Sequence, residues 1–264
     1  MRFRLKNGLA IGYKTRGVGV PIVLIPSIGC PKEMWDGVMA ELEGHYRVIA
    51  IEARGHGESD VPGGPFTMDD LADDVIEMLR AIGGGQKAIV GGCSMGGQIS
   101  QAVGVKAPEL LHGIVISNTG YLRNDKVREI MEGRALAAEK GMPASVWTTL
   151  NRWYDDAYQK AHPDVIAMTH DWLMHCDPIV HAWSWRAIKG LNTSDRLNVS
   201  KLPALCIGGE NDQATAASEV EAMAKALPNG TYRMCRNAGH LSPIEQPREY
   251  AGYVREFAEK VVRA

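Results

Sequence analysis

The chain has 264 residues, with 29 Lys and Arg against 31 Asp and Glu, so its formal net charge is −2. This near balance argues against a nucleic-acid-binding surface and against attraction to an anionic membrane. The length suits one large α/β domain, with or without an insertion. We therefore expect a small-molecule substrate as the partner, and homo-oligomer formation stays open.

Cysteines, histidines and the N-terminus limit the class of protein further. Five cysteines in mostly apolar surroundings argue against a disulfide framework. The spacing of His170, His175 and His181 does not place them on one helical face, and no Cys-x-x-Cys pair occurs, so we expect no metal and no cofactor. Residues 1–8 lack an apolar signal-peptide core, and no apolar run has membrane-spanning length. We therefore expect a cytoplasmic protein.

Short apolar runs typical of buried strands alternate with helical patterns along most of the chain. The strand-like runs lie at 21–26, 46–51, 87–90, 113–117, 202–208 and 231–235, after a two-stranded start at 2–15. Helical patterns lie at 34–42, 67–82, 98–106, 214–227 and 247–262, and Thr67 is an expected N-cap. This alternation predicts an α/β fold with a mostly parallel sheet and helices on both faces.

Residues 121–194 interrupt this alternation, because they show helical patterns at 127–140, 143–159 and 165–175 and no strand pattern. We interpret them as a helical cap inserted between two strands of a core domain formed by 1–120 and 195–264. The cap holds five of the six tryptophans. Its candidates for substrate contact are Trp153, Trp183, Trp185, Arg152 and Arg186, although packing and solvation are the ordinary roles of such residues.

The segment Gly92-Cys93-Ser94-Met95-Gly96 follows a strand-like run and precedes a helical pattern. Gly-x-Ser-x-Gly in this context is typical of a nucleophile elbow, in which a sharp turn exposes a serine hydroxyl. Side chains at the two glycines would collide with the neighbouring strand or helix. We expect Cys93 to point into the sheet as a small buried hydrophobe.

Ser94 needs a base and an acid, since a serine hydroxyl is a poor nucleophile on its own. His240 and Asp212 follow later strand-like runs and would supply them, with Glu210 as the rival acid. The backbone N–H groups of Met95 and Ile28 are the expected oxyanion hole. Together these residues predict a serine hydrolase.

Several further motifs strengthen this interpretation. They are Pro26-Ser27-Ile28-Gly29, Met34-Trp35-Asp36, the segment from Arg54 to Pro62, Cys93 to Gly97, His240 to Pro247, and in the cap Arg134 with Gly141-Met142, Arg152-Trp153 and Arg186-Ala187-Ile188. By these residues the chain resembles the α/β-hydrolase superfamily, and within it the 3-oxoadipate enol-lactonase-like serine hydrolases. The resemblance implies that Ser94, Asp212 and His240 are catalytic and that Ile28 and Met95 form the oxyanion hole.

The expected activity is cleavage of a small ester or lactone, enol-lactone-like, through an acyl-enzyme intermediate. Three alternatives stay open: a carbon–carbon bond hydrolase of ring-cleavage diketones, a perhydrolase-like enzyme, and a non-catalytic small-ligand receptor on the same fold. For Arg54 and His56 we expect roles in holding their loop together.

Overall fold

The computed structural model describes residues 1–121, 124–198 and 200–263, and their strands form one eight-stranded sheet of order β1-β2-β4-β3-β5-β6-β7-β8. The strands are β1 (Arg2–Arg4), β2 (Ala10–Arg16), β3 (Pro21–Ile25), β4 (Arg47–Ile51), β5 (Ala88–Cys93), β6 (Leu111–Ser117), β7 (Ala204–Gly209) and β8 (Gly230–Cys235). Only the pairs β1–β2 and β2–β4 are antiparallel. The predicted mostly parallel sheet is confirmed.

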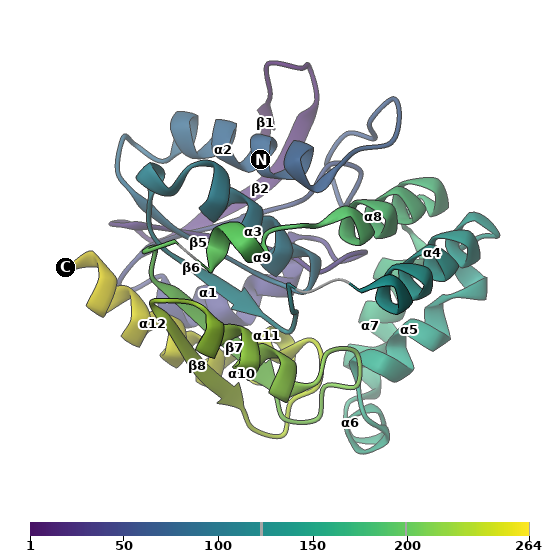
Figure 1. Ribbon diagram of the computed structural model, residues 1–264. Coiled ribbons are helices and arrows are strands. Elements are labelled where there is room, and N and C mark those ends of the chain that lie inside the picture. Colours follow the sequence, from purple (N-terminus) through teal and green to yellow (C-terminus); the bar gives the residue numbers. More distant parts are fainter. Residues whose placement is uncertain (122–123, 199, 264) are drawn as a thin grey trace.

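Helices cover both faces of this sheet, as predicted. The α-helices of the described residues are α1 (Asp36–Leu42), α2 (Met68–Ile82), α3 (Met95–Lys106), α4 (Asp125–Glu139), α5 (Val146–Trp153), α6 (Asp156–Ala161), α7 (Pro163–Met174), α8 (Pro178–Gly190), α9 (Ser194–Leu197), α10 (Ala217–Ala226), α11 (Ser242–Glu245) and α12 (Pro247–Val262). Figure 1 shows α3 in front of the sheet, and α1 and α12 behind it. Thr67 caps α2 as expected, since its hydroxyl accepts a hydrogen bond from the Asp70 amide.

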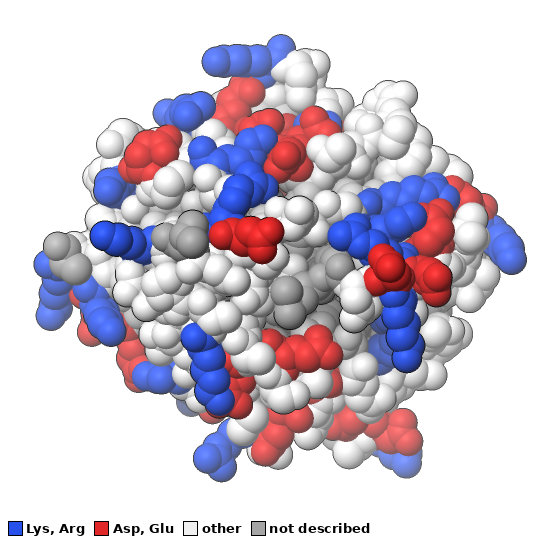
Figure 2. All heavy atoms as spheres, in the orientation of Figure 1, with Lys and Arg blue, Asp and Glu red and all other residues white. Residues whose placement is uncertain are grey.

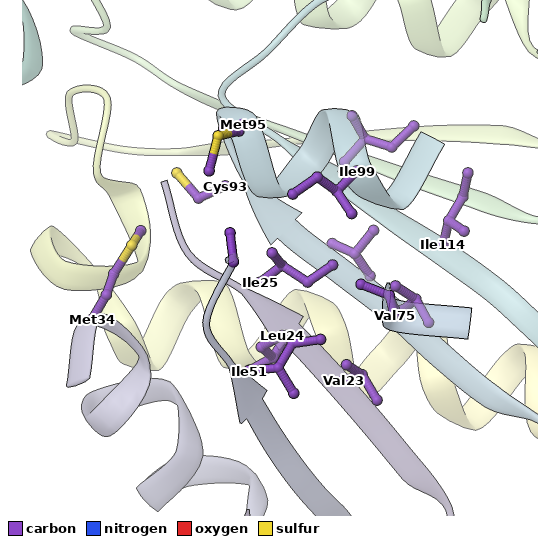
Figure 3. Close-up of a cluster of buried hydrophobic side chains, with 14 of the residues drawn as sticks. Val23, Leu24, Ile25, Met34, Ile51, Val75, Cys93, Met95, Ile99 and Ile114 are labelled. Atoms are coloured by element: carbon purple, nitrogen blue, oxygen red, sulfur yellow. The ribbon is translucent and has the colours of Figure 1, made fainter. Parts of the chain in front are cut away.

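The hydrophobic core lies between the central strands and these helices. Every residue of β3 is buried, as is usual for a parallel strand covered on both faces. Figure 3 shows side chains of β3 together with Ile99 of α3 and Val75 of α2. Burial of one such aliphatic side chain contributes about 1.5–3 kcal/mol. This packing fixes the relative positions of the strand ends at which the candidate site forms.

The predicted helical segment lies between β6 and β7 and consists of α4 to α8, which Figure 1 shows to one side of the sheet. No strand occurs among its described residues. The single helix expected over 143–159 is wrong, because Tyr154 is extended and the Asp155 side chain caps a new helix by accepting from the Tyr158 amide at 2.7 Å. We call residues 121–194 the helical insertion; its status as a separate domain stays a prediction.

The surface reflects the composition. Figure 2 shows cationic and anionic side chains interspersed over the visible face, in keeping with the small net charge. None of the described helices combines the length and the apolar character needed to cross a membrane.

Candidate active site

The site is built on the turn between β5 and α3. Ser94, at its apex, has φ 53° and ψ −114°, a backbone conformation that costs free energy for a residue with a side chain. A Cβ on Gly96 would overlap the carbonyl oxygen of Ile25, and a Cβ on Gly92 would overlap the backbone of Gly96. The predicted reason for both glycines is therefore confirmed.

The turn exposes Ser94 and buries its neighbours. Ser94 is the one residue of 91–97 that is not fully buried. It lines a cavity of about 180 Å³ together with His240 and Ile28. Cys93 is fully buried and belongs to the cluster in Figure 3, as expected of a small hydrophobe, and burial raises the pKa of its thiol well above the ordinary value. A buried, protonated thiol is a poor nucleophile.

His240, which lines the same cavity as Ser94, forms a buried pair with Asp212. The His240 Nδ1 lies 2.9 and 3.0 Å from the two carboxylate oxygens of Asp212. The Ala214 and Thr215 amides donate to the same carboxylate at 2.8 and 2.9 Å, which fixes its orientation. Since an ionised carboxylate can only accept, Nδ1 carries a proton, and in a neutral ring Nε2 is then free to accept one.

The rival acid lies elsewhere. The Glu210 carboxylate accepts a hydrogen bond from the Asn237 amide at 2.9 Å, and Glu210 is exposed. In the described residues, Asp212 supplies the one carboxylate within 4 Å of a His240 ring nitrogen. The geometry therefore favours Asp212 over Glu210.

Asn118 is a residue of the site that the sequence analysis missed. It follows β6 with φ 52°, a left-handed conformation that asparagine tolerates. Its side-chain NH₂ donates to Asp212 at 3.2 Å and to the Gly239 carbonyl at 3.1 Å, while its oxygen accepts from the Ser242 hydroxyl at 2.6 Å. Asn118 thus links the loops that carry Asp212 and His240. Its place directly after a buried strand was the available signal.

Trp153 positions His240 from the other side. The two rings are stacked with centroids 6.3 Å apart and an interplanar angle of 22°. The Trp153 carbonyl accepts from the His240 amide at 2.8 Å. Trp153 also forms part of the cavity wall, and its contact with a substrate stays a prediction.

Glu245 supports the same loop. Its carboxylate accepts a hydrogen bond from the Gly239 amide, next to His240, at 2.9 Å. Its second oxygen is buried and has no described partner. Burial raises the pKa of this carboxyl from its ordinary value of 4.5 to about 8.

The other predicted substrate contacts divide into two groups. Arg152 and Trp185 line the cavity, and Arg134 lies there with them. Trp183 instead packs edge-on against Phe66, with centroids 6.4 Å apart, and is absent from the cavity wall. Arg186 forms ion pairs with Glu132 and Glu139 at 3.0 and 2.5 Å, also away from this cavity. The helix α8 thus places the Trp183 and Arg186 side chains outside the wall of this cavity, and their contact with a substrate stays a prediction.

The two backbone amides predicted to form the oxyanion hole have no other acceptor in the described structure. Within the described residues, the amides of Ile28 and Met95 donate no hydrogen bond to another group.

His56 contacts the Arg54 carbonyl at 3.2 Å, and Arg54 binds Asp74 at 2.8 and 2.7 Å, so both hold their loop as expected. No group of three or more His, Cys, Asp or Glu suited to a metal ion occurs in the described part of the chain.

This combination of sheet, serine turn and His–Asp pair is that of a known family of enzymes. The chain belongs to the alpha/beta hydrolase family, whose model matches residues 22–252. Among its relatives, 3-oxoadipate enol-lactonase 2 of Acinetobacter baylyi is 28% identical over 248 residues, which cover 92% of this chain and 90% of the relative.

Two solved structures share the whole fold. The enol-lactonase from Burkholderia xenovorans superposes with a TM-score of 0.92 at 28% identity and covers 98% of this chain and 100% of its own. An esterase from Thermogutta terrifontis, solved with malate bound, gives a TM-score of 0.92 at 27% identity, with 99% of both chains covered. The resemblance to the 3-oxoadipate enol-lactonase-like group is confirmed.

The turn geometry yields a first prediction. Gly96→Ala should lower the free energy of unfolding by about 3 kcal/mol, because its methyl group meets backbone that cannot rotate away. Gly252→Ala is the matched control: Gly252 lies within α12 with open space around its Cα, so alanine should raise stability by about 0.5–1 kcal/mol. Urea denaturation measures both, and equal stabilities of the two variants would contradict the packing argument.

Glu245 yields a second prediction. A carboxyl whose pKa rises on folding loses stabilisation as pH increases from its unfolded pKa, 4.5, to its folded pKa, about 8. The free energy of unfolding of the wild type, relative to Glu245→Gln, should therefore decline over this interval and become constant above it. Denaturation curves of both proteins at several pH values between 4.5 and 9 measure the difference, and a difference independent of pH would refute the shift.

Proposed function

We propose that the protein is a serine hydrolase that cleaves a small ester or lactone through an acyl-enzyme intermediate. The observation that carries the proposal is the buried Asp212–His240 pair, in which His240 Nδ1 lies 2.9 Å from an Asp212 carboxylate oxygen while His240 lines the same cavity as Ser94. Membership of the alpha/beta hydrolase family, and similarity to an enol-lactonase and an esterase, support hydrolase activity in general.

In the proposed first half-reaction, the Ser94 oxygen attacks the substrate carbonyl carbon while His240 Nε2 takes the hydroxyl proton. Asp212 stabilises the resulting imidazolium and keeps its ring in place. When the bond from the carbonyl carbon to the leaving oxygen breaks, His240 gives the proton to that oxygen. The acyl group then remains on Ser94, and the alcohol, or the opened end of a lactone, is released.

In the second half-reaction, His240 takes a proton from water as the water attacks the acyl carbon. The bond to Ser94 breaks, and the proton returns to the serine. Both half-reactions place negative charge on the former carbonyl oxygen, for which the Ile28 and Met95 amides are the proposed donors. Their lack of other described hydrogen-bond partners supports this role. The positive end of the α3 dipole adds to the stabilisation.

Replacement of the nucleophile is the direct test. Ser94→Ala should lower kcat/KM for a short-chain 4-nitrophenyl ester by about four orders of magnitude or more, while its melting temperature stays at the wild-type value. A fluorophosphonate probe should label the wild type at Ser94, as located by mass spectrometry. Full activity of Ser94→Ala would overturn the mechanism. Absence of both labelling and hydrolysis over a panel of enol-lactones, esters and ring-cleavage diketones would favour a non-catalytic receptor.

The identity of the acid has its own test. Asp212→Asn should lower kcat by about three to four orders of magnitude, because the His240 ring loses its correct tautomer and the charge that stabilises its protonated form. Glu210→Gln, two residues away, is the matched control and should retain wild-type kcat. A larger loss in the Glu210 variant would show that the acid is misassigned.

A further inference from the structure

Gln98 lies in the wall of the cavity that contains Ser94, one helical turn further along α3. Its backbone amide donates to the Ser94 carbonyl at 3.1 Å, so the first turn of the helix holds the two residues together. Gln98 is only 4% exposed. A polar side chain buried this deeply normally has its hydrogen bonds satisfied within the protein.

The side-chain oxygen of Gln98 departs from this rule. Oε1 is buried and has no hydrogen-bond partner among the described residues. The other buried side-chain atoms of the described chain that lack a partner belong to residues outside the wall of this cavity. Because an unpaired buried acceptor is unfavourable, a donor supplied by a molecule in the cavity would bind there with a gain in free energy.

Hydrogen bonds on the other side of the amide determine which of its atoms is unpaired. Nε2 of Gln98 donates to the Thr119 hydroxyl at 2.8 Å, and that hydroxyl donates to the Gly120 carbonyl at 3.3 Å. Since a hydroxyl has one proton, Thr119 accepts from Gln98 and does not also donate to it. Thr119 and Gly120 line the same cavity, so this chain of hydrogen bonds runs along its wall.

The charges of the cavity indicate that the matching donor is uncharged. Arg134 and Arg152 line the same wall, and burial, followed by the charge of Arg152, lowers the pKa of Arg134 only to about 10. Glu219 also lines the cavity, but it is exposed, so solvent screens its charge. The two guanidinium groups would repel a substrate ammonium group, whereas a hydroxyl or an amide N–H could donate without this repulsion.

We propose that the side-chain oxygen of Gln98 binds an uncharged hydrogen-bond donor of the substrate, so that the enzyme prefers esters or lactones with a hydroxyl or an amide N–H near the scissile carbonyl. This inference rests on the proposed function, since it assigns the substrate class of the same site. The nearness to the scissile carbonyl follows from the place of Gln98 one turn after Ser94. An analogue without the donor would leave the buried oxygen unpaired, and the site would therefore discriminate against it.

The test compares 4-nitrophenyl esters that differ in one donor group. The ester of 3-hydroxybutyric acid is assayed beside that of 3-methylbutyric acid, in which a methyl group replaces the hydroxyl. The ester of 3-acetamidopropanoic acid is assayed beside that of 5-oxohexanoic acid, in which a CH₂ group replaces the N–H. After subtraction of spontaneous hydrolysis, the wild type should show kcat/KM at least about tenfold higher for the donor ester of one or both pairs. The preferred pair identifies the donor as a hydroxyl or an amide.

A methionine substitution assigns this preference to Gln98. Gln98→Met keeps the length of the side chain and removes its acceptor, so the ratio of kcat/KM within the preferred pair should fall by about tenfold. A purely structural role of Gln98 would change kcat/KM for both esters of a pair alike. Gln101→Met is the matched control on the same helix, because Gln101 lies outside the cavity wall and its amide is bonded to Thr193 and Gly120. It should leave the ratio unchanged.

Thr119→Val tests the same amide without altering Gln98. It removes the hydroxyl that holds Nε2, so the amide can rotate, and the ratio should fall by about threefold. Fluorophosphonate labelling of Ser94 and the melting temperature of each variant check that the site still forms. If Gln98→Met does not fold, the wild-type ratio and Thr119→Val decide between the outcomes.

The outcomes separate this inference from the proposed function. Equal kcat/KM for the donor ester and its analogue in both pairs, or a preference that a folded Gln98→Met variant keeps, would overturn the role of Gln98 while the serine hydrolase stands. A ratio that Gln101→Met lowers as much as Gln98→Met does would overturn it too. Hydrolysis of none of the four esters, together with unlabelled Ser94, would instead remove the proposed function.

Discussion

The site depends on one steric constraint, the close approach of the β5–α3 turn to the end of β3. At Gly96 the backbone lies so near the Ile25 carbonyl that no side chain fits between them. This contact holds Ser94 in its unusual backbone conformation, with its neighbours buried and its own side chain in the cavity. The free-energy cost of that conformation is met by the surrounding core, in which β3 is buried along its full length.

A second feature, the hydrogen-bond network behind His240, joins segments that are distant in sequence. Asp212 follows β7, Asn118 follows β6 and His240 follows β8, so the parallel order of these strands brings the three to one edge of the sheet. Asn118 contacts Asp212 and the Gly239 carbonyl, and Trp153 of the insertion stacks on the His240 ring. The His240 ring is therefore oriented by both the sheet and the insertion, and a displacement of α5 would move it.

Some features of this structure follow from residues close together in sequence, and others depend on tertiary packing. Strand and helix patterns, the Thr67 cap and the two glycines of the turn follow from residue type and spacing, and the structure confirms them. The break at Tyr154 escaped prediction because α5 and α6 continue one another's pattern, and an Asp155 cap is visible only once the helix start is known. Trp183 and Trp185 are two residues apart on α8 and therefore point in different directions. Which of them faces the cavity depends on how α8 packs, and the periodicity of the sequence does not determine this.

The same limit applies to the arginines of the insertion. In sequence, Arg134, Arg152 and Arg186 are equivalent cations on helices, and each could be a solvated surface residue. Tertiary packing distinguishes them: α4 supplies Glu132 and Glu139 to neutralise Arg186, and leaves Arg134 beside Trp185 without an acidic partner among the described residues. Because charges in a partly buried wall interact more strongly than charges in water, the unpaired arginines affect a ligand in the cavity more than the paired one does. Thus the strand ends position Ser94, Asp212 and His240, while the packing of the insertion determines which of its charges face the cavity.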